Sequence, residues 1–67
     1  MLNDMLMWNK IGRIVTRLSE TLDVDTAQAI DIFYRSQVCK DIHNPDTGLY
    51  YRGDIYILNE LLGEIRE

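Results

Sequence analysis

The residues best able to do chemistry in this 67-residue chain are its only cysteine, Cys39, and its only histidine, His43. They stand four positions apart, so on a helix they share one face. In that arrangement they could form a thiolate–imidazolium pair or two ligands of a metal ion. A catalytic thiol also needs an orienting third group and a pocket that excludes water, for which so short a chain has little room. We therefore expect a small buried thiol and a histidine at a helix end.

Three further polar residues near this pair are expected to serve architecture. Ser36 lies between Arg35 and Gln37, without the glycines of a nucleophile elbow, so we expect its hydroxyl to donate to the preceding helical turn. Asp41 and Asp46 lack the alternating carboxylates of a calcium loop. One cysteine excludes an intrachain disulfide, and one histidine beside it falls short of the four ligands of a structural zinc site. No catalytic residue, metal or cofactor is predicted.

Charge and hydropathy limit the classes of partner. The net charge is −4, whereas affinity for a nucleic-acid backbone comes largely from clustered Lys and Arg. The composition therefore disfavours nucleic acid. No run approaches the roughly 18 apolar residues of a membrane span, and the first residues lack the basic segment and cleavage site of a signal peptide. We expect a cytoplasmic protein with no membrane partner.

Helical periodicity dominates the chain and predicts one all-α domain over 1–67. The apolar residues at helical spacing over about 3–22 are Met1, Met5, Trp8, Ile11, Val15, Leu18 and Leu22, with Ile14 widening the stripe. A second helix is expected over 26–41, with Asp25 as its N-cap. A third is expected over 55–66, with Asp54 as its N-cap.

Two non-helical pieces separate the second and third predicted helices. The sequence HNPDTG at 43–48 predicts a tight turn, since proline fixes φ and glycine accepts a positive φ. The sequence LYYR at 49–52 has a strong β preference and predicts a short extended hook. Alternation would then place Leu49 and Tyr51 on one side of the hook. The fold expected is a small three-helix domain with this hook between helices two and three.

Association is expected because the core is small. A chain of this length hides only about 60% of the surface that its unfolded form exposes, and small domains usually add a disulfide, a metal or a partner. Three apolar stripes exceed what 67 residues can cover. We therefore expect a homodimer or a subunit that docks on a larger protein.

The candidate interface residues are of two kinds. They are the basic stripe of Lys10, Arg13 and Arg17, and the aromatic residues Trp8, Tyr50, Tyr51 and Tyr56. For the basic stripe, a solvated face with an Arg17–Glu20 pair, a contact with an acidic protein and a contact with DNA all stay open. For the aromatic residues, an interface and simple packing are equally compatible with the pattern.

Three short segments resemble a known family. The sequences FYRS at 33–36, GLY at 48–50 and YILNELL at 56–62 are similar, over about 18–62, to the short bacterial domain-of-unknown-function family three-seven-nine-one. The chain lacks the histidine that this family commonly has in the hook region. Members have no assigned enzymatic activity, and many are encoded beside a larger ADP-ribosyltransferase-like protein. The resemblance therefore implies an accessory or antitoxin-like subunit, with Tyr34 and Ser36 as helix-packing residues.

Two functional hypotheses follow. The first is a non-enzymatic interaction module that forms a homodimer or binds a larger bacterial protein through apolar and tyrosine surface. The alternative is a small DNA-binding transcriptional regulator that uses the second helix or the basic stripe of the first.

Overall fold

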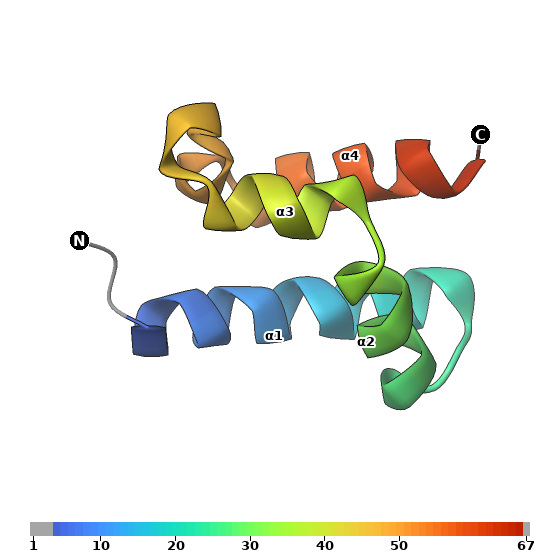
Figure 1. Cartoon of the computed structure of the whole chain (residues 1–67). Coiled ribbons are helices and arrows are strands. Elements are labelled where there is room, and N and C mark those ends of the chain that lie inside the picture. Colours follow the sequence, from blue (N-terminus) through green and yellow to red (C-terminus); the bar gives the residue numbers. More distant parts are fainter. Residues whose placement is uncertain (1–3, 67) are drawn as a thin grey trace.

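The computed structural model describes residues 4–66, which form α-helices, two short 3₁₀ turns and no β-strand (Figure 1). The elements are α1 (Asp4–Leu22), α2 (Thr26–Tyr34), α3 (Gln37–His43), η1 (Pro45–Thr47), η2 (Leu49–Tyr51) and α4 (Asp54–Arg66). The predicted all-α class is confirmed. Met1 and Asn3, which the sequence placed in the first helix, lie outside the described residues. No helix within this range has the length and apolar composition needed to cross a bilayer.

Helix α1 supplies one side of the core. Its buried side chains are Met7, Ile11, Ile14, Val15 and Leu18. Their spacing of three and four residues is that of one helix face. Met5 and Trp8, which were expected in this stripe, are 71% and 60% exposed. The apolar face of α1 is wider than the core that it contacts, so helical spacing alone did not show which of its apolar residues are buried.

The single helix expected over 26–41 is wrong, because the chain breaks at Ser36 into α2 and α3. The Ser36 hydroxyl accepts a hydrogen bond from the Cys39 N–H (3.1 Å) and donates one to the Phe33 carbonyl (2.5 Å). The expected bond to the preceding turn is thus present, but the helix does not continue through it. Ser36 instead caps the start of α3, a position at which serine is favoured.

A carboxylate from α4 completes the start of α3. Glu64 accepts hydrogen bonds from the backbone N–H groups of Gln37 (2.8 Å) and Val38 (2.9 Å). These are the first two amides of α3, which have no acceptor within their own helix. Because Glu64 lies 27 residues beyond Gln37, the division between α2 and α3 depends on the docking of α4.

The predicted Asp25 cap and the predicted turn at 43–48 are both present. The Asp25 side chain accepts from the Gln28 N–H (2.7 Å) at the start of α2. In the turn, Asn44 Oδ1 accepts from the Asp46 N–H (3.0 Å), and Gly48 adopts a positive φ of 67°. These local signals were strong enough to be read from the sequence, because each is satisfied within a few residues.

The extended hook predicted over 49–52 is instead a single 3₁₀ turn. The Arg52 N–H donates to the Leu49 carbonyl (3.0 Å). With three residues per turn, the side chains of Leu49 and Tyr51 no longer share a side. Leu49 is buried, whereas Tyr51 is 75% exposed. The β preference does not prevail because no strand within residues 4–66 offers a partner.

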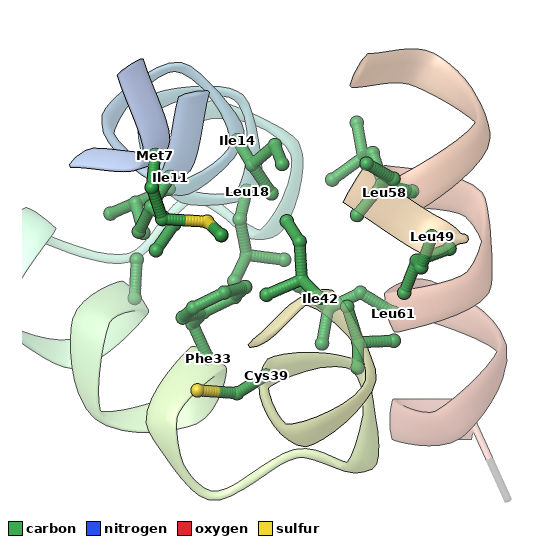
Figure 2. Packing of buried hydrophobic residues seen from close by; sticks show 14 residues of the cluster. Met7, Ile11, Ile14, Leu18, Phe33, Cys39, Ile42, Leu49, Leu58 and Leu61 are labelled. Carbon is green, nitrogen blue, oxygen red and sulfur yellow. The ribbon is translucent and has the colours of Figure 1, made fainter. Parts of the chain in front are cut away.

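The core lies between two layers of helices, with α1 and α2 in one layer and α3 and α4 in the other (Figure 1). Figure 2 shows Leu18, Phe33 and Ile42 pointing into the space between the helices, and all three are almost fully buried. They come from three different helices, and Ile57 and Leu61 of α4 belong to the same cluster. All four helices therefore contribute to one core.

Replacing Glu64 tests its role as a cap supplied by α4. We expect Glu64→Ala to lower the free energy of unfolding by about 1–2 kcal/mol, because two amides of α3 lose a charged acceptor. The matched control is Glu60→Ala, one turn earlier on an exposed position of α4, which should change it by less than about 0.5 kcal/mol. Urea denaturation followed by circular dichroism measures both. Equal effects of the two substitutions would contradict this role.

Candidate interaction surface

The structure brings Cys39 and His43 together without activating the thiol. Cys39 Sγ and His43 Nδ1 are 4.0 Å apart, but the same Nδ1 lies 2.7 Å from the Cys39 carbonyl oxygen. A carbonyl only accepts, so Nδ1 carries a proton and cannot take one from the thiol. Burial raises the pKa of the Cys39 thiol, which is the opposite of what a nucleophile needs. The buried thiol and helix-terminal histidine expected from the sequence are both present.

The other polar candidates lie in local structural positions. Ser36 caps α3, the Asp41 carboxylate accepts from the Gln37 side-chain amide (3.0 Å), and Asp46 lies in the first turn of η1. In the part of the chain that the structure describes, no three His, Cys, Asp or Glu side chains are grouped closely enough to hold a metal ion. These residues therefore belong to the local helix and turn structure.

Two of the three basic residues on α1 bind one carboxylate of α4. Lys10 Nζ donates to Asp54 Oδ1 (2.9 Å), and Arg13 Nε donates to Asp54 Oδ2 (2.7 Å). Asp54 is the first residue of α4 and faces α1, so its predicted role as the N-cap is wrong. Lys10 also lies over the ring of Tyr50, with Nζ 5.7 Å from the ring centre. These contacts join η2 and the start of α4 to α1.

Arg17 is the third basic residue of α1 and differs from the other two in its contacts. The expected pair with Glu20 is not formed, and Arg17 makes no ion pair within residues 4–66. The charged residues of α1 are Asp4, Lys10, Arg13, Arg17 and Glu20. They sum to +1, whereas the whole chain carries −4, so the rest of the chain sums to −5. Positive charge is therefore concentrated on α1.

Large apolar side chains remain exposed on several elements. They are Met5, Leu6, Trp8, Ile30, Tyr34, Tyr51, Ile55, Tyr56 and Ile65. Three of them, Trp8, Ile30 and Tyr34, border a groove of about 410 Å³ between α1 and α2. We call it the α1–α2 groove, and its lining is Trp8, Ile11, Gly12, Val15, Thr16, Thr26, Ile30 and Tyr34. It is the candidate interaction site.

Buried residues form the floor of the α1–α2 groove, and half-exposed residues form its walls. Ile11 and Val15 belong to the core, whereas Ile30 and Tyr34 on the α2 wall are 42% and 43% exposed. The Tyr34 ring packs edge-on against Phe33, with ring centres 5.3 Å apart, which restricts its orientation. Burial is the main cause of the raised pKa of Tyr34, so its hydroxyl stays protonated and can donate a hydrogen bond to a partner.

Gly12 leaves a gap in the α1 wall. Apart from the neighbouring backbone of α1, nothing lies within 4 Å of the point where a Cβ would stand. No other element within residues 4–66 therefore packs closely against Gly12. Thr16 follows one helical turn later, so this part of the wall carries only small side chains.

The aromatic interface candidates fall in three places. Trp8 lines the α1–α2 groove, and Tyr50 lies beneath Lys10. Tyr51 packs edge-on against Tyr50 and is otherwise exposed, while Tyr56 lies on the exposed side of α4. Of these four aromatic residues, only Trp8 lines the α1–α2 groove.

Ile30 and Tyr34 complete the groove but were not among the interface candidates. Helical spacing does not distinguish them from core residues, because a core face and the adjoining groove wall follow the same periodicity. A usable signal was present in the sequence. Thr26, Ile30 and Tyr34 form a second line at spacings of four, beside the buried line of Ala29 and Phe33.

No protein-family model, curated protein or solved structure matches this chain. The resemblance to family three-seven-nine-one therefore stays a prediction. What bears on function is the geometry of the α1–α2 groove and of the basic side of α1.

Alanine substitutions at two glycines test whether the gap at Gly12 is open. We expect Gly12→Ala and Gly63→Ala each to raise the free energy of unfolding by about 0.5–1 kcal/mol, because glycine is a poor helix former. Both lie inside helices, and an added Cβ meets nothing within 4 Å. Thermal and urea denaturation measure the change. Destabilisation by Gly12→Ala alone would mean that this wall is closed.

The ion cluster of Lys10, Arg13 and Asp54 makes stability depend on pH. The hydrogen bond from Arg13 is the main cause of the lowered pKa of Asp54. A carboxyl with a lowered folded-state pKa stabilises the fold above its unfolded pKa of about 3.9, and this contribution is lost as the pH falls through the folded pKa.

We therefore expect Asp54→Asn to be less stable than the wild type at pH 7, and this difference to shrink below about pH 4. The control is Asp46→Asn, because the Asp46 carboxylate makes no ion pair in the described chain. Urea titrations between pH 3 and pH 7 measure both variants. A difference between Asp54→Asn and wild type that stays constant over this range would count against the ion cluster.

Proposed function

We propose that this chain is a non-enzymatic module that binds another protein through the α1–α2 groove. The observation that carries the proposal is that Trp8, Ile30 and Tyr34 keep large apolar surfaces in water above a floor of core residues. Leaving such surface in water is unfavourable, and Trp and Tyr are enriched where proteins bind each other. A partner that fills the groove removes this surface from water.

Two kinds of partner fit this proposal, a second copy of the chain and a larger protein. Either one adds buried area to a chain whose own core is small. The resemblance to family three-seven-nine-one favours the larger protein, and it would make this chain an accessory or antitoxin-like subunit in a bacterial cytoplasm.

Duplex DNA is the weaker candidate partner. Asp54 already binds Lys10 and Arg13, and the chain carries a net charge of −4. A salt titration of binding to duplex DNA separates the two functions, since affinity for phosphates falls steeply with salt. Binding to duplex DNA that is measurable at about 50 mM salt and weakens as the salt concentration rises would favour the DNA-binding regulator instead.

Filling the gap at Gly12 tests the interaction function. Gly12→Leu places a side chain at the groove, and Gly63→Leu makes the same change in an open part of α4. Light scattering after size exclusion and affinity capture from the native host are measured for the wild type and for both variants. Circular dichroism establishes that both variants fold.

We expect the wild type and Gly63→Leu to form the same complex, either a dimer or a complex with a captured protein. Gly12→Leu should weaken it by at least about tenfold, because the side chain occupies the site of the partner. Two results together would contradict the proposal. The wild type would stay monomeric, and Gly12→Leu would capture every protein that the wild type captures.

A further inference from the structure

We infer that the occupant of the α1–α2 groove is one amphipathic α-helix of another protein, with acidic side chains along the flank that faces Arg17. The inference rests on the proposed function and specifies the chemistry of the partner. The shape of the groove and the charges beside it both lead to this partner.

The α1–α2 groove has the form that a single helix fills. Its two sides are helices, its floor is the apolar pair Ile11 and Val15, and Trp8 and Ile30 rise on either side. Gly12 allows a partner backbone to approach α1 closely, because nothing outside its own helix lies within 4 Å of its Cβ position. A helix in such a groove anchors apolar side chains at spacings of three and four. A partner strand would find no sheet edge to pair with its amides.

Positive charge lies beside the groove, on the outer side of α1. A second, shallow hollow shares Trp8, Gly12 and Thr16 with the groove, so a helix lying over Gly12 covers parts of both. The other residues of that hollow are Asn9, Arg13, Arg17 and Glu20. Arg17 makes no ion pair within residues 4–66. A partner helix with Asp or Glu on this flank gives Arg17 a counter-ion.

A second copy of this chain fits these features less well. Pairing α1 with α1 brings two positively charged helices together. The exposed side of α4 carries the apolar residue Ile55. Asp54 and Glu64 of this helix already bind α1 and α3, so Glu60 is the one carboxylate within residues 54–66 that is left to pair with Arg17 of a second copy. An acidic helix from a different protein therefore complements the surface better.

A displayed peptide library tests the inference with a defined probe. Each peptide is about 20 residues long, which is enough for about five helical turns. A stripe of Leu, Ile and Ala at helical spacing is fixed, the flanking positions vary among Glu, Lys and Gln, and Trp is omitted. Peptides are selected on the full chain and then titrated. Because Trp8 is the only tryptophan of the chain, a shift of its fluorescence to shorter wavelength reports burial in the groove.

We expect the selected peptides to carry Glu along one flank and to shift the fluorescence of Trp8. Arg17→Glu should weaken their binding about fivefold, since an attraction becomes a repulsion. The control is Lys40→Glu on an exposed position of α3, which changes the net charge equally and should leave the affinity within about twofold. Gly12→Leu should abolish binding, and Gly63→Leu should not.

Selected peptides with Lys or Gln flanks, or acidic peptides that bind Arg17→Glu as tightly as the wild type, would overturn the inference. A selection that yields no Gly12-dependent peptide would also overturn it. In that event the scattering and capture measurements on Gly12→Leu decide the proposed function separately. If these measurements show a complex that Gly12→Leu weakens, the proposed function holds and the groove has a different occupant. If they show no such complex, both the proposed function and this inference are wrong.

Discussion

Glu64 binds the first two amides of α3, and this contact sets the course of the second half of the chain. A continuous helix over 26–41 would stay in the layer of α1 and α2, whereas the break at Ser36 lets α3 cross to the layer of α4. Ile42 then reaches the core beside Phe33. The serine alone satisfies one amide, and the carboxylate satisfies two more. The break is therefore a tertiary feature that a local cap assists.

Each side of helix α1 makes different contacts, and this explains why its apolar face is so wide. One side enters the core, a second is joined to α4 by Lys10, Arg13 and Asp54, and a third faces α2 with Trp8 and Gly12 at its edge. The ion cluster fixes α1 against α4 while α2 packs on the other side. The groove is what remains open between two helices that the rest of the fold holds at a fixed separation.

Most features satisfied within a few residues were predictable, the 3₁₀ turn at 49–51 being an exception, whereas features that need a distant partner were not. The all-α class, the Asp25 cap and the turn at 43–48 follow from short-range chemistry. The α2–α3 break requires Glu64, and the orientation of Asp54 requires α1, so neither is visible in a local window. The groove was missed for a related reason. Periodicity shows that a residue is apolar on a helix face, but not whether another element covers it.

The cap that Glu64 provides also couples the stability of α3 to that of α4. Helix α3 has seven residues, too few to persist alone in water. Its first amides are held by α4, so undocking of α4 would also release α3, and the two would open as one cooperative unit. All the residues that line the groove belong to α1 and α2. The α1–α2 groove and the helices α3 and α4 are thus encoded in successive halves of the chain, and a substitution in α3 or α4 can change the shape of the groove without contacting it.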